Sequence, residues 1–353
     1  MRFSIDIMTQ KKQVGVLGSG SFGLAMTNVL AENQDVLLYT RREEVAEAVN
    51  KGRFYNKIPV AKNVVATNDL QLICESCELL FPIVPSLNFR DLMRMASPFL
   101  RPYHILIHGT KGFDVTHVYD EQERRPILRR EDVHTMSEVI RQETNVLRIG
   151  CLSGPNLAKE IISGQPCGTV VASPFTEVIR AGQQALSTKR FQVYGSHELI
   201  GAELAGSMKN TIAIAAGMLA GRGLGYNIWA LLVTRGISEM ITLGKAMGAS
   251  PKAFLGSAGI GDLIATASSP ASRNHQVGVR LAQGETLTQI AASMEEVAEG
   301  VRTTKIIKEV ADYYHVKIPI CMTIYHILYE GFPLDRAIPF LMTYPYSADV
   351  DFL

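Results

Sequence analysis

The stretch VGVLGSGSFGLAMTNVLAEN, residues 14–33, decides the fold. Its first four residues are apolar and predict a strand, the glycines turn the chain, and LAMTNVLAEN has the apolar spacing of a helix. A second apolar run, DVLLYT at 35–40, predicts the next strand. The order strand, tight turn, helix and strand is typical of a parallel sheet covered by helices.

The turn in this stretch contains Gly18, Gly20 and Gly23 in the pattern G-x-G-x-x-G. The first glycine permits the tight turn, the second lets a pyrophosphate approach the backbone, and the third allows close packing of helix on strand. The N-terminus of the following helix favours an anion. A plain glycine turn is the alternative, but the strand before the motif and the helix after it favour a dinucleotide site.

Two arginines, Arg41 and Arg42, follow the second predicted strand, where an NAD-specific site usually has an acidic residue for the ribose 2′-hydroxyl. An arginine at this place accommodates a 2′-phosphate. We therefore expect NADP(H) to bind, with NAD(H) as the other candidate. The competing interpretation is that both arginines are solvated surface charges.

The rest of the chain divides into two parts of different character. Further apolar runs at 79–84, 105–107 and 149–152 alternate with helix-like segments at 88–100 and 136–143, whereas long helical segments follow at 199–220, 227–247, 286–294 and 302–314. The predicted fold class is α/β, with an N-terminal Rossmann-like doubly wound sheet followed by an all-helical C-terminal domain. The predicted domains are residues 1–197, which bind the dinucleotide, and residues 198–353, which carry the substrate site and catalysis.

Composition excludes several classes of protein. The chain has 353 residues, enough for two buried cores, and its 35 Lys and Arg against 34 Asp and Glu create no field of one sign for nucleic acid or a membrane surface. The longest apolar helical stretch, 210–221, is too short for a bilayer, and residues 1–12 lack the apolar core of a secretory signal, so we expect a short N-terminal extension. Five cysteines, an odd number, favour a reducing compartment and hence the cytoplasm.

Three local features carry separate expectations. Cys74 and Cys77 form one C-x-x-C, but no second ligand pair stands at zinc spacing, so we expect ordinary thiols and no metal. Pro82 lies inside a predicted strand, which we expect to be short or near an edge because proline lacks the amide. The charged segment 114–132 interrupts the α/β rhythm and predicts an exposed hairpin or loop.

Several strings in order resemble the bacterial NAD(P)-dependent glycerol-3-phosphate dehydrogenase family, from about residue 14 to about 338. They are GSGSFGLA (18–25), VPS (84–86), TKGF (110–113), SGPNLAKE (153–160), ELAGSMKN (203–210), GDL (261–263), SRN (272–274) and EGVRT (299–303). The joint order and spacing of these strings are far more specific than any one of them.

The resemblance implies roles for named residues. Lys209 would exchange a proton with the substrate C2 hydroxyl, and Lys111 would lie near both substrate and nicotinamide, with Asp262 beside the lysines. The implied substrate contacts are Lys111, Gly154, Asn156, Asp262, Ser272, Arg273 and Asn274. The implied cofactor contacts, beyond the glycines, are Ser21, Phe22, Arg41, Lys111, Ala158, Arg273, Val297 and Glu299. The resemblance further implies interconversion of sn-glycerol 3-phosphate and dihydroxyacetone phosphate, supply of glycerol 3-phosphate for phospholipids, and a homodimer.

The chemistry of the reaction asks for the same residue types. Hydride transfer from a secondary alcohol needs a base for the hydroxyl proton, and a lysine serves when desolvation and a neighbouring cation lower its pKa. Lys209 on an apolar helix with Lys111 nearby would meet both conditions, and Asp262 would limit the drop. A phosphate dianion calls for charge and hydrogen bonds together, which Arg273 between Ser272 and Asn274 provides.

Each of these residues has an ordinary structural interpretation if taken alone. Lys209 would be a solvated charge, Ser272 a helix cap, and Gly154 part of a turn. Two rival functions also stand. One is a dehydrogenase of similar architecture, such as a β-hydroxyacid dehydrogenase or ketopantoate reductase, and the other is a redox sensor that binds the dinucleotide without catalysis. The two lysines with SRN favour a phosphorylated polyol, and a sensor would not need a group that transfers a proton.

Overall fold

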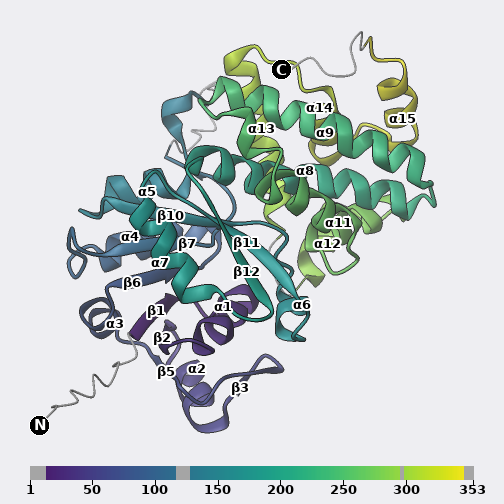
Figure 1. The fold of residues 1–353 in the computed structure, drawn as a ribbon. Helices are drawn as coiled ribbons and strands as arrows, with labels where there is room; N and C mark the ends of the chain where they lie inside the picture. Colours follow the sequence, from purple (N-terminus) through teal and green to yellow (C-terminus); the bar gives the residue numbers. More distant parts are fainter. Residues whose placement is uncertain (1–12, 117–127, 295–297, 346–353) are drawn as a thin grey trace, which may run out of the picture.

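The computed structural model describes residues 13–116, 128–294 and 298–345. The predicted N-terminal extension and Val297 lie outside these residues. An eight-stranded sheet fills the N-terminal half, and Figure 1 shows it below the helices of the C-terminal half. In spatial order its strands are β12 (Phe191–Ser196), β11 (Cys167–Ala172), β10 (Arg148–Ser153), β7 (Ile105–His108), β6 (Leu79–Pro82), β1 (Gln13–Leu17), β2 (Asp35–Tyr39) and β5 (Val64–Thr67).

All neighbouring strands of this sheet are parallel except β10 and β11, which pair antiparallel with Leu152 opposite Val171. Two small ribbons accompany the sheet, formed by β3 (Phe54–Tyr55) with β4 (Ile58–Pro59) and by β8 (Asp114–Val115) with β9 (Val133–His134). The strand order reverses on either side of β1 and β6. Ligands of open α/β sheets bind at such a switch point, beyond the carboxyl ends of the strands.

Helices cover both faces of the sheet, because alternate strand residues point to opposite sides. Val16 belongs to a core with α1 (Ser21–Ala31), α6 (Ala158–Ile162) and α7 (Thr176–Leu186). Leu17 belongs to a second core with α3 (Leu70–Ser76), α4 (Phe89–Ala96) and α5 (Met136–Glu143), while α2 (Glu43–Glu47) follows β2. The doubly wound sheet predicted from the sequence is therefore confirmed.

Pro82 ends β6, which has four residues and lies between β1 and β7. Of the two alternatives expected for this strand, a short strand or a place near an edge, the structure shows the short strand. The ladder continues around the missing amide, because Ile83 donates its backbone N–H to the Leu17 carbonyl (2.8 Å) and Pro82 itself accepts from the Gly109 N–H (3.0 Å). A proline at the last position of an inner strand thus costs the sheet little.

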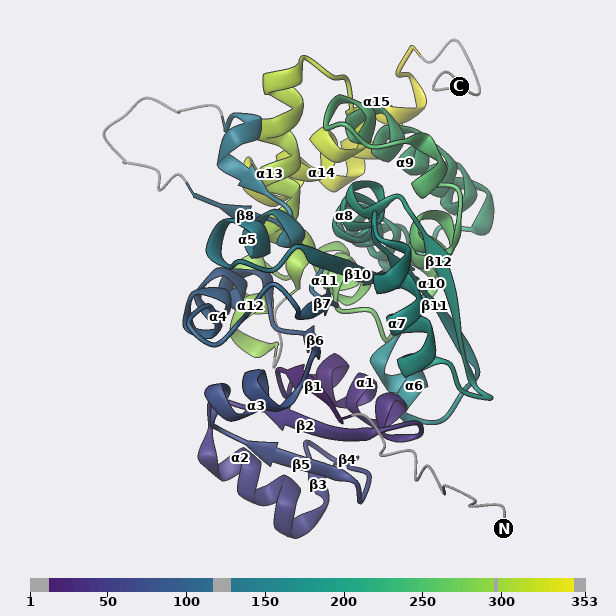
Figure 2. The ribbon, with the colours of Figure 1, turned by 60° about the vertical axis from the view of Figure 1, so that its left-hand side comes forward.

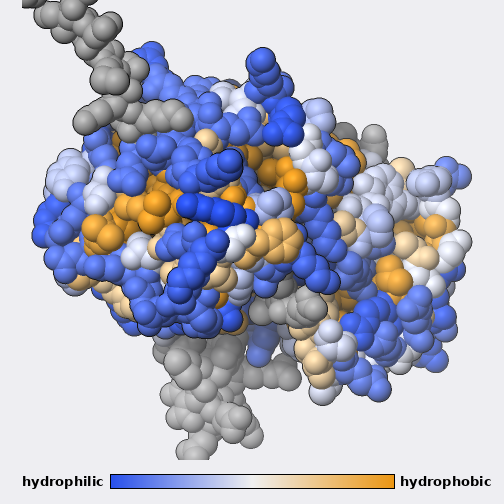
Figure 3. All heavy atoms as spheres, turned by 90° about the horizontal axis from the view of Figure 1, so that it is seen from below, coloured by the Kyte–Doolittle hydropathy of each residue, from blue (hydrophilic) through white to orange (hydrophobic). Residues whose placement is uncertain are grey.

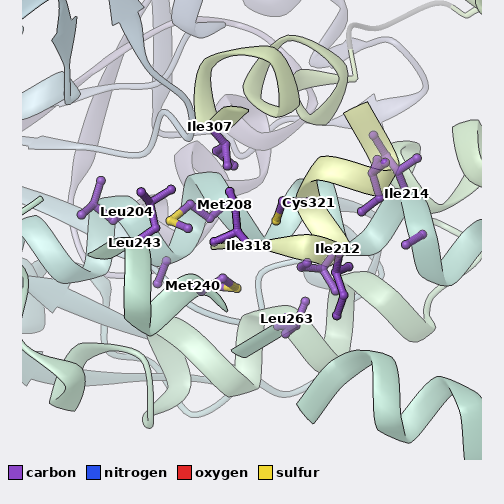
Figure 4. Close-up of a cluster of buried hydrophobic side chains, with 14 of the residues drawn as sticks. Leu204, Met208, Ile212, Ile214, Met240, Leu243, Leu263, Ile307, Ile318 and Cys321 are labelled. Carbon is purple, nitrogen blue, oxygen red and sulfur yellow. The ribbon is translucent and has the colours of Figure 1, made fainter. Parts of the chain in front are cut away.

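The described residues from 198 onward form helices and no strand, as predicted. They are α8 (Leu199–Gly221), α9 (Tyr226–Ala246), α10 (Asp262–Ser268), α11 (Arg273–Ala282), α12 (Leu287–Ser293), α13 (Glu299–Tyr314), α14 (Pro319–Tyr329) and α15 (Leu334–Met342). Helix α8 is buried along almost its whole length and packs against α9, α10, α11, α13 and α14. Figure 2 shows these helices gathered at one end of the sheet, and Figure 4 shows their side chains meeting in one hydrophobic core, Met208 among them.

Two glycines set the contact between α8 and α11. A Cβ on Gly217 would lie 2.0 Å from the His275 carbonyl oxygen, and one on Gly278 would lie 1.9 Å from the Ile214 carbonyl oxygen. The two backbones therefore touch at a distance that no larger residue permits. This contact fixes the position of α11 along α8.

The remaining local expectations have mixed outcomes. Segment 114–132 has a hairpin at its base, where β8 and β9 pair, but Leu128 is buried and residues 117–127 are not described. Cys74 and Cys77 are buried thiols of the second core, and burial raises the pKa of each to about 12. Among the described residues there is no group of three or more His, Cys, Asp or Glu fit to hold a metal ion, nor any helix long and apolar enough to cross a membrane.

Candidate active site

The glycine motif forms a tight turn between β1 and α1. Gly18 has a φ of +131°, and a Cβ there would lie 2.1 Å from the Ile83 carbonyl oxygen, whereas a Cβ on Gly23 would lie 2.1 Å from the Gly18 carbonyl oxygen. A Cβ on Gly20 would meet no atom within 4 Å. The first and third glycines are thus required by the fold, and the second leaves the backbone open at the start of α1, where an anion is favoured.

The predicted cofactor contacts at the start of α1 lie beside loops from other strands. Ser21 and Phe22 begin the helix, and a Cβ on Gly109, just after β7, would lie 3.0 Å from the Phe22 ring. Ala158 begins α6, which packs against α1, and its side chain joins the same hydrophobic core as Phe22. The structure therefore brings these three residues to the same edge of the sheet.

Arg41 and Arg42 follow β2 at this edge, and both are exposed. Arg42 is engaged locally, because it donates a hydrogen bond to the Tyr55 hydroxyl and lies 3.7 Å from a Glu44 carboxylate oxygen. None of the described residues forms a hydrogen bond or ion pair with Arg41. Of the two, Arg41 is therefore the one whose guanidinium is available to a 2′-phosphate.

A buried carboxylate joins the two lysines predicted for catalysis. Asp262, at the start of α10, is 1% exposed, and its two oxygens accept hydrogen bonds from Lys209 Nζ (2.6 Å) and Lys111 Nζ (2.6 Å). Lys209 lies in the middle of α8, and Lys111 lies in the loop after β7. One aspartate thus holds two ammonium groups from the two halves of the molecule.

The setting of Lys209 changes its acidity. Its side chain is buried within α8 and also donates a hydrogen bond to the Thr266 hydroxyl. Burial lowers the pKa of Lys209 to about 8, because water no longer stabilises the ammonium; Asp262 raises the pKa and Lys111 lowers it. A lysine with such a pKa can both give and take a proton near neutral pH.

Gly154 and Asn156 lie in the turn after β10, next to Lys111. Gly154 has a φ of +147°, and its carbonyl oxygen accepts a hydrogen bond from Lys111 Nζ (3.3 Å). The Asn156 amide is fixed by the Gly168 carbonyl oxygen (2.8 Å) and by the Thr169 hydroxyl (2.7 Å). The turn therefore presents a rigid polar rim beside the lysines.

The SRN string occupies the N-terminus of α11. Ser272 caps this helix by accepting the His275 N–H, as its ordinary interpretation predicted, while Arg273 at the first helical position is exposed. The Asn274 side-chain oxygen accepts the Gly300 N–H (2.9 Å), which leaves its amide hydrogens as donors. Neighbouring Glu299 accepts hydrogen bonds from Ser86, with 2.9 Å to its N–H and 2.7 Å to its hydroxyl. Helices α11 and α13 and the loop after β6 are thus connected.

Sequence reasoning missed three residues of this region. Thr266 bonds Lys209, and its only sequence signal is its spacing of one helical turn after Asp262. Ser86 and Arg302 connect the halves, since Arg302 donates to the Phe113 carbonyl oxygen and to the Ser86 hydroxyl. Both residues stand in strings quoted above, VPS and EGVRT, but nothing in the sequence pairs them.

Family models match both halves of the chain. The model described as NAD-dependent glycerol-3-phosphate dehydrogenase N-terminus matches residues 13–178, and that of the C-terminus matches residues 198–339. The chain belongs to the NAD-dependent glycerol-3-phosphate dehydrogenase family. Relatives in this family include glycerol-3-phosphate dehydrogenase (NAD(P)+) of Saccharophagus degradans, which is 38% identical over 98% of this chain and 93% of its own length, and that of Pseudomonas fluorescens, 39% identical over 98% and 95%.

Solved structures agree with this family. Glycerol-3-phosphate dehydrogenase from Coxiella burnetii has a TM-score of 0.83 at 28% identity and covers 94% of this chain and 99% of its own. A ketopantoate reductase from Ralstonia eutropha shares the fold with a TM-score of 0.54 at 14% identity, covering 90% of this chain and 97% of its own. The rival architecture considered above is therefore related in fold, while the family models and sequence identities assign the chain to the glycerol-3-phosphate dehydrogenases.

Proposed function

We propose that the chain interconverts sn-glycerol 3-phosphate and dihydroxyacetone phosphate with NADP(H) or NAD(H). The observation that carries this proposal is the hydrogen-bonded group of Lys209, Asp262 and Lys111, whose members come from both halves of a chain that belongs to this family. The active site is proposed to lie between a dinucleotide domain, 1–197, and a helical domain, 198–353, because Lys111 and Lys209 meet there at Asp262.

Lys209 is the residue proposed to move the proton. In the direction of alcohol oxidation its neutral amine accepts the proton of the C2 hydroxyl, and in the direction of ketone reduction its ammonium returns a proton to the oxygen. Its pKa of about 8 makes both forms accessible. Asp262 orients the Lys209 amine through their 2.6 Å hydrogen bond, and Lys111 supplies a second cation for the substrate oxygens.

The phosphate of the substrate is proposed to bind at the SRN string. Arg273 provides a planar set of donors, and Ser272 and Asn274 add a hydroxyl and an amide at the N-terminus of α11. Gly154 and Asn156 are proposed to contact the glycerol part, since their turn lies against Lys111. Substrate and proton donor are thus held by rigid elements, which favours a reactive geometry.

The residues at the glycine turn fit a dinucleotide. Gly20 leaves the backbone open at the N-terminus of α1, whose first residues are Ser21 and Phe22. A nicotinamide bound there would supply or accept the hydride at the substrate C2. Arg41 is proposed to bind the 2′-phosphate of the adenosine ribose, and Arg42 is proposed as a weaker contact beside it. Further proposed contacts come from Gly18, Gly23, Lys111, Ala158, Arg273, Val297 and Glu299.

The proposed reaction is tested by the loss of NADPH absorbance, and separately of NADH absorbance, on addition of dihydroxyacetone phosphate. Dihydroxyacetone without the phosphate is the control. We expect rapid oxidation only with the phosphorylated ketone. A faster reaction with ketopantoate than with dihydroxyacetone phosphate would assign the chain to the rival reductase activity, and binding of NADPH without any turnover would favour the sensor.

Cofactor preference is tested with Arg41→Asp. The substitution removes the charge available to a 2′-phosphate and should weaken NADPH about tenfold or more, with a far smaller effect on NADH. Fluorescence titration of both cofactors measures the two dissociation constants. Arg42→Asp is the matched comparison, because Arg42 already bonds Tyr55 and should matter less. Equal losses for NADPH and NADH in Arg41→Asp would refute the 2′-phosphate role.

The cellular setting is also a proposal. We infer a cytoplasmic enzyme that forms glycerol 3-phosphate for phospholipid synthesis and acts as a homodimer, as the family resemblance implies. On the underside shown in Figure 3, hydrophilic residues lie between the hydrophobic groups, and exposed apolar residues are normal on a protein surface. That face therefore adds no support for the homodimer, which light scattering of the purified protein would test.

A further inference from the structure

A second buried carboxylate lies on α8, six residues before Lys209. Glu203 is 7% exposed, and its Oε1 accepts the Ser137 N–H (2.8 Å) while its Oε2 accepts the Ser137 hydroxyl (2.6 Å). Oε1 also lies 3.0 Å from His108 Nε2. Burial raises the pKa of Glu203, but the hydrogen bonds from His108 and Ser137 outweigh it, and the pKa stays below its ordinary value. Glu203 is therefore an ionised carboxylate inside the protein.

The second residue that contacts the Glu203 carboxylate is His108, the last residue of β7. It is 1% exposed, its ring meets Phe89 edge to face at 5.7 Å, and its Nδ1 is buried with no hydrogen-bond partner among the described residues. A proton on Nδ1 would leave a buried N–H donor without an acceptor, which costs more free energy than an unprotonated Nδ1 without a donor. The proton therefore lies on Nε2 and is donated to Glu203.

The segment from His108 to Gly112, which carries Lys111, is fastened to α8 at both ends. Glu203 bonds His108 at one end. At the other end, the Ser207 hydroxyl, whose shorter hydrogen bond goes to the Glu203 carbonyl oxygen (2.8 Å), lies 3.3 Å from the Gly112 carbonyl oxygen. Between them, a Cβ on Gly206 would lie 3.6 Å from Cγ and Cδ of Lys111, so the lysine stem passes over a glycine. Positions 203, 206 and 207 form one face of α8.

We propose that Glu203 is a positioning residue for Lys111: by fixing His108 it determines where the Lys111 amine meets Asp262 and the substrate. This inference rests on the proposed function, and no family property or sequence string assigned such a role to Glu203 or His108. The charges of Glu203 and Lys111 also both act on the buried thiol of Cys151. The pKa of Cys151 is raised by burial and then by Glu203, and it is lowered by Lys111, so Glu203 and Lys111 face the same interior region.

The chain offers a matched control at Glu239. This carboxylate of α9 is buried to a similar degree and accepts two backbone N–H groups, those of Ile320 (2.6 Å) and Cys321 (3.0 Å), but it contacts none of the site residues. Glu203→Gln and Glu239→Gln each replace one buried carboxyl group and keep the shape of the side chain. Any effect on turnover that is common to both variants reflects stability alone.

The experiment measures kcat for reduction of dihydroxyacetone phosphate and the dissociation constant of NADPH for the wild type and both variants. We expect Glu203→Gln to lower kcat about tenfold or more, because a displaced Lys111 amine no longer meets the substrate, while the dissociation constant of NADPH changes by a smaller factor. Glu239→Gln should leave kcat within about twofold of the wild type. Ser137→Ala, which removes only one donor to Glu203, should lower kcat in the same direction by a smaller factor.

A double-mutant cycle with Lys111→Met separates positioning from a general structural role. If Glu203 acts through Lys111, Glu203→Gln has no further effect once Lys111 is gone. The inference is overturned if Glu203→Gln and Glu239→Gln lower kcat equally, or if the full factor persists in the Lys111→Met background. Should turnover of Lys111→Met fall below detection, the difference between the two glutamine variants decides alone. A wild type without turnover overturns the proposed function, and this inference with it.

Discussion

Asp262 and Glu239 are both buried carboxylates, yet they are neutralised in different ways. Asp262 accepts from the ammonium groups of Lys111 and Lys209, whereas Glu239 accepts from two backbone N–H groups at the start of α14. An ammonium can lose its proton near neutral pH, and an amide cannot. The first arrangement therefore joins the two halves of the chain and holds the proposed proton donor, whereas the second joins α9 to α14 within the helical half.

The largest effect should come from removing the shared proton donor. Lys209→Met should lower turnover by about a thousandfold or more, because it removes the group proposed to exchange the proton of the C2 oxygen. Binding of NADPH, measured by fluorescence, should remain nearly intact, because Lys209 is not among the proposed cofactor contacts. Near-normal turnover of Lys209→Met would contradict the proposal that Lys209 exchanges the proton.

Removing the shared carboxylate should cost somewhat less. Asp262→Asn keeps the shape but leaves two ammonium groups without their anion, so turnover should fall about a hundredfold. Since Asp262 raises the pKa of Lys209, its loss lowers that pKa further. Ketone reduction should therefore decline at a lower pH than in the wild type, and an unshifted profile would contradict the assigned role.

The pH profile of the wild type follows from the same lysine. Ketone reduction needs the ammonium form of Lys209, so kcat/KM should fall as pH rises through about 8, about tenfold for each further unit. Alcohol oxidation needs the neutral amine and should rise over the same range. Initial rates in both directions across pH 6 to 10 (about four units) measure these limbs. Two profiles with the same direction would exclude Lys209 as the titrating group.

The smallest effect on turnover, and one on stability, is expected at Glu239. Burial raises the pKa of Glu239 from 4.5 to about 7, so between these values the folded state holds a proton that the unfolded state has lost. Stability from this group is present below about pH 4.5 and is lost as pH rises through about 7. Glu239→Gln cannot titrate, so the free energy of unfolding of the wild type minus that of the variant should fall by about 3 kcal/mol over this range.

Urea denaturation at several pH values measures this difference, with turnover as the control. A constant difference between pH 4.5 and 7 would show that Glu239 does not titrate there. A large loss of turnover in Glu239→Gln would show that Glu239, like Asp262, affects the reaction, and would contradict its purely structural role.

Periodicity and local motifs predicted much of this fold. Local sequence patterns, in which the informative residues stand only a few positions apart, predict three features. These are the turn at Gly18, the long helices of the C-terminal half and the change of character near residue 198. Strands β5, β11 and β12 were not predicted, because their short apolar runs give little periodicity. The interior position of Pro82 could not be foreseen, since it depends on the partners of neighbouring strands.

For the candidate site too, the sequence predicted some residues but not their geometry. Strings resembling a known family placed Lys209, Lys111 and Asp262 together, and the structure brings all three within hydrogen-bond distance. Their geometry was beyond the sequence, because Asp262 bonds residues 53 and 151 positions away along the chain. Thr266, Ser86 and His108 were missed for the same reason, since each takes part through hydrogen bonds to residues far away in the sequence.

The contact of Gly217 with α11 has a consequence for which molecules fit the site. Lys209 lies eight residues before Gly217, about 12 Å along α8, and Ser272 lies six residues before Gly278, about 9 Å along α11. The two glycines therefore determine how far the proposed proton donor stands from the string proposed to bind phosphate. If those roles hold, the crossing of α8 and α11 sets the length of substrate that fits the site.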